Sequence, residues 1–306
     1  MTSRERMICA LNHTQPDRVP YCISFTQPAF EKMAQYFDDR DFMRKLDQAL
    51  VGYGMSYPES WKMVSPDIWR DEFGVEWNRS VDKDIGVVCN RAASLDALDE
   101  YRFPDPADPQ RWQHFPKKPE DTGGKFVVAN IGFSLFERAW TLVGMEELLT
   151  AMVENPDAVD ALLDAITNHN LQLIEHACQY AIDAVMFGDD WGSQTGVIMG
   201  VPLWRRFIKP RIREMYEASH RRGKYVFIHS CGKVDSLFPD LIECGVDCFN
   251  PFQPEVMDVY EVKRRYGDRL SFWGGISTQH TLPYGTPQEV RDEVKRLMDE
   301  IGRDGG

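Results

Sequence analysis

The sequence predicts an α/β protein that folds as a (βα)8 barrel, and three observations carry this prediction. From Phe126 onward, short and almost wholly apolar runs alternate with amphipathic helical segments. The runs are continuously apolar, which is typical of strands buried on both faces of a parallel sheet. Repeated strand–helix units form either an open doubly wound sheet or a closed barrel. No G-x-G-x-x-G or G-x-x-x-x-G-K-[ST] motif follows a strand, which disfavours the nucleotide-binding sheets and favours the barrel.

The segment before residue 58 is expected to supply the first two strands and three helices. Thr2 or Ser3 can cap a short first helix, which Asn12 and the turn residues after it end. The apolar run VPYCISFT predicts a buried strand, and a second strand is poorly defined. The expected helices cover residues 3–11, 28–37 and 41–50, and the expected strands cover residues 19–26 and 51–57.

Residues 58–125 are expected to form an excursion from the barrel. Two pieces of this segment, 72–77 and 85–89, predict a small antiparallel hairpin. A proline-rich loop follows, with Pro104, Pro106, Pro109, Pro116 and Pro119. We interpret the excursion as an insertion that is either a lid or a loop without a functional role, with equal weight.

Five strands and five helices are expected after the excursion. The strands are 126–133, 183–189, 224–230, 246–252 and 270–276, and the helices are near 145–180, 202–221, 235–243, 256–266 and 287–301. Asn155 before a proline and Thr286 before a proline predict helix N-caps, the second within a capping box.

The expected strands number seven, and the sequence ends at Gly306, where an eighth strand of a barrel should begin. Either the eighth strand is missing from the sequence, or the count is wrong by one. We expect residues 1–306 to form a single barrel domain, with 58–125 as its insertion.

Charge and composition exclude several classes of function. Thirty-five basic and 48 acidic residues give a net charge of −13, which disfavours binding to nucleic acid and to anionic membranes. No apolar run reaches the roughly 18 residues of a membrane helix, and the charged N-terminus does not resemble a signal peptide. Seven cysteines are too few for a disulfide framework in a chain of this length, and their number is odd. These features predict a soluble, reduced, cytoplasmic protein.

Side chains at predicted strand ends are the candidates for chemistry, because a barrel builds its active site there. His229 and Cys231 lie two residues apart at one such end, so both point to the same side of the strand. An imidazole and a thiolate make half of a zinc site, and Asp189 or Asp190 at the preceding strand end can supply an oxygen ligand. The alternatives are a buried histidine beside an inert core cysteine, and aspartates that bind loop amides.

Further strand-end residues are expected to contact a small-molecule substrate. Trp191 and other aromatic residues near strand ends suggest a pocket for an apolar or aromatic compound, although aromatic residues also pack cores. Cys244 and Cys248 fall toward the opposite end of the barrel and are expected to pack in the core. The other candidate substrate contacts are Asn130, Gln253, Gln279 and His280.

Three blocks of the sequence resemble proteins of the uroporphyrinogen decarboxylase superfamily. They are the opening residues 3–13 with Pro16-Asp-Arg-Val-Pro20, residues 227–233 (FIHSCGK) followed by 241–247, and residues 274–287 (GGISTQHTLPYGTP). The resemblance covers nearly the whole chain and implies a single (βα)8 barrel.

The superfamily contains two chemistries. Its decarboxylases need no metal and bind an octacarboxylate tetrapyrrole through arginines near the first strand, whereas residues 25–30 here contain none. The strand ends offer chiefly Arg138 and Lys233 as cations, and burying many carboxylates without cations is costly. Decarboxylation is therefore the less favoured activity, and a carboxy-lyase or a non-catalytic ligand-binding barrel is the alternative.

The other branch comprises corrinoid-dependent methyltransferases, whose zinc ion is held by an H-x-C pair, a distant cysteine and often an acidic residue. His229 and Cys231 match the pair, and Asp189 or Asp190 matches the acidic ligand; the distant cysteine would lie beyond Gly306. The resemblance implies Zn²⁺ as cofactor and Asp190 and His229 as catalytic residues. No D-x-H-x-x-G motif is present, so the corrinoid is expected on a separate partner protein. A homodimer is one assembly that the sequence allows.

Overall fold

Six parallel strands form the main sheet of the computed structural model, which describes residues 1–57 and 59–306. Their order, β1-β6-β7-β8-β9-β10, follows the chain without reversal, as in a barrel rather than in a doubly wound sheet. The strands are β1 (Leu50–Gly54), β6 (Phe126–Ile131), β7 (Ala184–Gly188), β8 (Tyr225–His229), β9 (Cys248–Phe252) and β10 (Ser271–Gly274). The sheet is therefore an open six-stranded part of a barrel, one strand fewer than expected.

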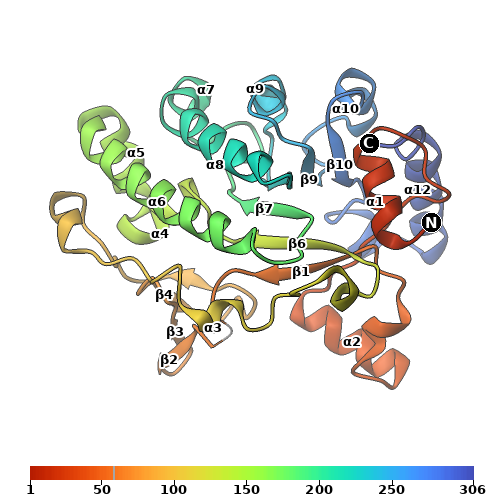
Figure 1. The fold of residues 1–306 in the computed structure, drawn as a ribbon, viewed down its shortest axis with the longest axis horizontal. Coiled ribbons are helices and arrows are strands. Elements are labelled where there is room, and N and C mark those ends of the chain that lie inside the picture. Colours follow the sequence, from red (N-terminus) through yellow and green to blue (C-terminus); the bar gives the residue numbers. More distant parts are fainter. Residues whose placement is uncertain (58) are drawn as a thin grey trace.

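Helices cover one side of this sheet in chain order, from α5 to α10 (Figure 1). The helices are α1 (Ser3–Leu11), α2 (Gln27–Phe37), α3 (Pro109–Trp112), α4 (Phe136–Val143), α5 (Met145–Glu154), α6 (Pro156–Ala177), α7 (Gly200–Leu203), α8 (Lys209–Arg221), α9 (Phe238–Glu243), α10 (Val259–Tyr266), α11 (Thr281–Tyr284) and α12 (Pro287–Glu300). The capping boxes of Thr2 and Thr286 are confirmed. Asn155 occupies the N-cap of α6, but its side chain makes no capping hydrogen bond. None of the helices in the described residues combines the length and apolar character that a bilayer crossing requires.

The expected first strand at 19–26 is wrong, and so is the expected helix at 41–50. Gln48 explains both differences, because its side chain accepts a hydrogen bond from Ile23 N at 2.8 Å and donates one to Ile23 O at 2.7 Å. The backbone of Ala49 also donates to Tyr21 O. Segment 19–26 is thus bound to the approach to β1 instead of joining the sheet. Only a 3₁₀ turn, Phe42–Lys45, remains of the expected helix.

The excursion carries a second sheet of four antiparallel strands, ordered β2-β3-β4-β5. They are β2 (Lys62–Ser65), β3 (Ile68–Arg70), β4 (Glu76–Asn78) and β5 (Val87–Val88). The expected hairpin is confirmed by the pairing of Trp77 with Val88. Pro58, the first residue of the expected insertion, lies outside the described residues. Trp77 packs on Phe133 of the β6–α4 loop, with ring centroids 5.1 Å apart, so the excursion shares the core of the main sheet.

The inner face of the main sheet carries its own apolar cluster, separate from the large cluster beneath the helices. Phe126 and Val128 of β6 belong to it, with Phe227 of β8, Cys248 of β9 and Leu11 of α1. Because strand side chains alternate, the inner face continues toward the strand ends with Asn130, His229 and Asn250. The expectation that Cys248 and Cys244 pack in the core is confirmed, since both are buried in apolar clusters.

Candidate metal centre

Asp190, His229 and Cys231 converge where β7 and β8 end. One potential ligand atom from each lies within 4.8 Å of the others. His229 Nε2 is 3.5 Å from Cys231 Sγ and 3.8 Å from Asp190 Oδ1. Within the described residues, this is the one group of three or more acidic, histidine or cysteine side chains with such spacing. The side chains of Asp190 and His229 are each 37% exposed, so the group is accessible from solvent.

The neighbouring strands hold the β8 exit from both sides. Asp190 Oδ1 accepts a hydrogen bond from Cys231 N at 2.7 Å, and Gln253 Oε1 accepts one from Gly232 N at 2.8 Å. Gly232 has a φ of +88°, and a Cβ atom there would collide with the backbone of Gly192. A glycine is therefore required for the close approach that brings Cys231 beside Asp190.

Asp189 does not join the group, although the sequence allowed either aspartate. Its side chain is fully buried, and its oxygens accept hydrogen bonds from Glu137 N at 2.8 Å and from Trp191 Nε1 at 2.6 Å. Burial raises its pKa to about 6. Asp189 thus binds the first turn of α4, as in the alternative interpretation that it satisfies loop amides.

Trp191 is also placed differently from the expectation of a substrate contact. Its side chain is fully buried and packs edge-to-face on Trp204, with ring centroids 5.3 Å apart. A side chain without exposed surface cannot line a pocket in this conformation. The side-chain oxygen of Gln253 accepts a hydrogen bond from the loop after Cys231, and its expected contact with a substrate stays a prediction.

The remaining expected contacts are divided between two places. Asn130 lies at the end of β6 on the inner face, next to β7 in the sheet. Gln279 and His280 lie with the β10–α12 connection, where Glu255 Oε1 accepts a hydrogen bond from Gln279 N at 3.0 Å. His280 lines a cavity of about 510 Å³ with Glu255 and residues of α10 and α12, and none of the three converging side chains is among its lining residues.

Carboxylates dominate the electrostatics around Cys231. Burial, followed by the charge of Asp190, raises the pKa of the Cys231 thiol to about 12. Burial and the charges of Asp190 and Asp189 raise the pKa of Glu137 to about 8. Glu137, which follows β6 and was one of the strand-end residues of the sequence, had no predicted role; the structure places its carboxyl among the charges that surround Cys231. The surrounding charge favours a cation and disfavours an anion.

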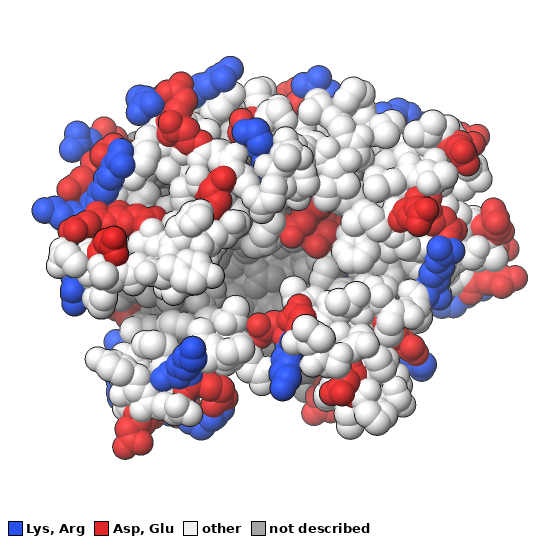
Figure 2. Space-filling view, turned by 180° about the vertical axis from the view of Figure 1, so that it is seen from behind, with Lys and Arg blue, Asp and Glu red and all other residues white. Residues whose placement is uncertain are grey.

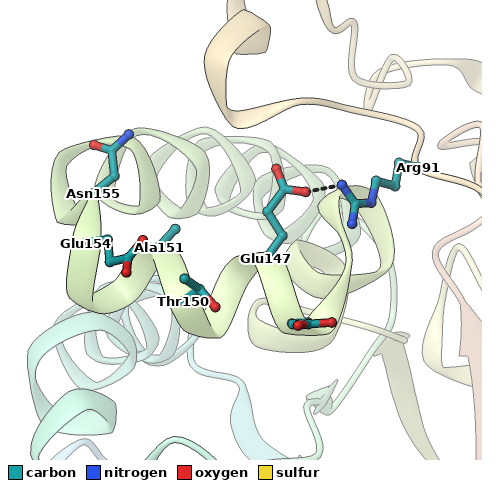
Figure 3. A pocket seen from close by; sticks show the side chains of 7 residues that line it. Arg91, Glu147, Thr150, Ala151, Glu154 and Asn155 are labelled. Carbon is teal, nitrogen blue, oxygen red and sulfur yellow. Dashed lines mark hydrogen bonds and ion pairs between the residues drawn. The ribbon is translucent and has the colours of Figure 1, made fainter.

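Acidic side chains also occur on the surface of the molecule. Figure 2 shows one face of the molecule hollowed near its centre, with acidic side chains at the border of the hollow. A cavity of about 430 Å³ on α5 is lined by Glu146, Glu147 and Glu154 and by Arg91, which pairs with Glu147 (Figure 3). This cavity offers acidic side chains without a histidine or cysteine among its lining residues.

The converging side chains fit a zinc ion by their chemistry. Imidazole nitrogen, thiolate sulfur and carboxylate oxygen are the three ligand types that zinc takes in proteins, and three protein ligands leave a position for substrate. Without a cation, His229 Nε2 and Asp190 Oδ1 face each other with the Cys231 thiol as the hydrogen donor nearest to Nε2. A divalent ion at this position could be bound by all three side chains at once.

Comparison with known proteins places the chain in a family. The sequence profile described as uroporphyrinogen decarboxylase (URO-D) matches residues 82–306. The chain belongs to the uroporphyrinogen decarboxylase family. A solved methyltransferase from Methanosarcina mazei has the same fold, with a TM-score of 0.69 and 18% identity over 100% of this chain and 90% of that chain.

Curated relatives of this URO-D family protein fall into two groups. A methylcobamide:CoM methyltransferase from Methanosarcina barkeri is 23% identical over 158 residues, 52% of this chain and 45% of the relative. A methylated-thiol–coenzyme M methyltransferase from Methanosarcina mazei is 22% identical, covering 53% and 42%. A uroporphyrinogen decarboxylase from Pseudomonas fluorescens is 24% identical, covering 51% and 42%. The chain thus spans less than half the length of these relatives.

Proposed function

We propose that this protein is a zinc-dependent methyltransferase that moves a methyl group between a small methylated or methoxylated compound and a corrinoid carried by a separate protein. The observation that carries the proposal is the convergence of Asp190, His229 and Cys231 at the strand ends. The two relatives named as methyltransferases support methyl transfer as the class of reaction.

His229, Cys231 and Asp190 would hold the ion. Asp189 would position the loop after β7 through its hydrogen bonds with Glu137 N and Trp191 Nε1. A bound zinc ion would lower the pKa of a substrate thiol or polarise a methylated oxygen or nitrogen. Asp190 does two things in this site: one oxygen fixes the Cys231 backbone, and its charge favours a cation beside the thiol. Asn130, at the end of β6, is the proposed substrate contact on the inner face.

Decarboxylation of a polycarboxylate is less well supported. Arg138 is buried and pairs with Asp71 at 3.4 Å, and its guanidinium lies 3.7 Å from the centroid of the Phe73 ring. Lys233 donates to Val256 O at 3.2 Å and pairs with Asp235 at 3.5 Å. Both strand-end cations are thus engaged with the protein, while carboxylates surround Cys231. An anionic substrate would meet repulsion here.

Metal content tests the proposal. Purified protein is expected to retain about one zinc ion per chain after dialysis against a weak chelator, and Cys231→Ser is expected to lose it. Cys178→Ser is the matched control, because Cys178 is a half-buried free thiol outside the group. Zinc that is absent from the wild type, or unaffected by Cys231→Ser, contradicts the proposal. Decarboxylation of uroporphyrinogen by the purified protein would support the alternative.

A further inference from the structure

The side chain of Asn250 connects His229 to the neighbouring strand β10. Its Oδ1 is 2.6 Å from His229 Nδ1, and its Nδ2 donates to Trp273 O at 2.9 Å. The backbone of Asn250 also accepts a hydrogen bond from Ser230 N at 2.7 Å. Asn250 therefore contacts the β8 exit through both its backbone and its side chain.

The orientation of the Asn250 amide follows from its partner on β10. A backbone carbonyl such as Trp273 O has no proton to donate, so the group that faces it must be the NH₂ of the amide. The amide oxygen then faces His229. This assignment does not depend on distinguishing oxygen from nitrogen by position alone, because the reversed amide would set two acceptors against each other.

The protonation of the His229 ring follows from the orientation of the amide. The Asn250 oxygen can only accept, so His229 Nδ1 must carry a hydrogen. In the neutral ring, Nε2 then has a free lone pair, and it points toward Cys231 Sγ and Asp190 Oδ1. A run of contacts across four adjacent strands, from β10 through β9 and β8 to β7, thus ends at the candidate metal centre.

We propose that Asn250 is a positioning residue, which selects the Nδ1–H tautomer of His229 and aims Nε2 at the cation held with Cys231 and Asp190. The tautomer follows from the hydrogen bonds alone, whereas the aim toward a cation rests on the proposed function. Partners of this kind on the second ring nitrogen of a metal-binding histidine typically change metal affinity by about 10- to 100-fold when removed.

Nitrogen NMR of selectively ¹⁵N-labelled histidine in metal-free protein tests the tautomer directly. Wild-type His229 is expected to show a protonated Nδ1 and an unprotonated Nε2 at pH 8. Asn250→Leu, which has a similar volume and no polar atoms, is expected to give a mixture of tautomers. Asn168→Leu is the matched control, since Asn168 is exposed on α6. A wild-type ring protonated at Nε2, or an unchanged ring in Asn250→Leu, would overturn the proposal.

Zinc affinity, measured by competition with a chromogenic chelator, tests the consequence. Asn250→Leu is expected to bind zinc about 10- to 100-fold more weakly. Asn250→Asp still accepts from Nδ1, although its second oxygen faces Trp273 O, and it is expected to lose clearly less affinity than Asn250→Leu. Equal losses in both variants would indicate a merely structural role and overturn the proposal. Thermal melting of the metal-free variants identifies any that are misfolded. If Asn250→Leu is misfolded, the zinc affinity of Asn250→Asp relative to wild type decides between a positioning role and a merely structural one. A wild type with the expected tautomer but no zinc binding would refute the proposed function and leave the tautomer selection standing.

Discussion

His169 is expected to make the fold acid-sensitive at the joint between the excursion and the helical layer. It lies on α6 between Phe73 and Phe103, with ring centroids 5.5 Å from each, and only 4% of it is exposed. Burial, aided by the charges of Arg111 and Arg138, lowers its pKa from 6.5 to about 4. The folded state therefore holds the neutral ring.

The sign of the effect follows from which state binds the proton more tightly. The unfolded chain protonates His169 near pH 6.5 and the folded state only near pH 4, so protons favour unfolding in this window. At 1.36 kcal/mol per pKa unit, the full loss of stability is about 3 kcal/mol. At pH 5 it is about 2 kcal/mol, and above pH 7 it is nearly zero.

Urea unfolding of the wild type and of His169→Leu, each at pH 7.5 and pH 5, measures this loss. The difference in unfolding free energy between the two proteins is expected to shift by about 2 kcal/mol in favour of the variant at pH 5. Asp189 and Glu137, with raised pKa values, act in the opposite direction, but both proteins contain them. A difference that stays constant with pH would refute the reasoning.

Three further perturbations have defined outcomes. Arg111→Met removes one member of the buried Arg111–Glu72 ion pair and is expected to lower the free energy of unfolding in urea by about 3–5 kcal/mol. Adding Glu72→Leu is expected to recover much of this loss, because no unpaired charge then stays buried. No recovery would contradict this. Thr286→Ala removes the capping box of α12 and should cost about 1 kcal/mol, whereas Thr286→Ser should be nearly neutral; equal losses would count against the cap. Gly232→Ala should weaken zinc binding and should lower the melting temperature more than Gly223→Ala does. At Gly223 φ is also positive, but no atom obstructs a Cβ. Similar melting temperatures in the two variants would refute the role of the close approach.

Much of the fold could be predicted because the local signals agree with the tertiary structure. The five apolar runs after residue 126 are the strands β6 to β10, since a parallel strand buried on both faces has a continuous apolar pattern. The run at 19–26 has the same pattern and is no strand. Its backbone is bound by Gln48, and a long-range side-chain contact of this kind leaves no local signal.

The site could be predicted in part for similar reasons. Spacing and strand-end position singled out His229 and Cys231, because alternation places them on one side. The choice between Asp189 and Asp190 depends on which side of the β7 exit each side chain faces. Both residues lie in the turn after β7, where side chains no longer alternate between the two faces as they do in a strand. Asn250 acts through a contact across strands, which the sequence of one strand does not contain. The single-domain organisation, the homodimer and the corrinoid partner stay predictions.

X-ray absorption at the zinc edge of the zinc-loaded protein tests the central claim most directly. One sulfur at about 2.3 Å, with nitrogen and oxygen ligands at about 2.0–2.2 Å, is the expected first shell. The sulfur is expected to vanish in Cys231→Ser and to stay in Cys178→Ser. A shell without sulfur in the wild type, or a sulfur that survives Cys231→Ser, would show that zinc does not bind where β7 and β8 end.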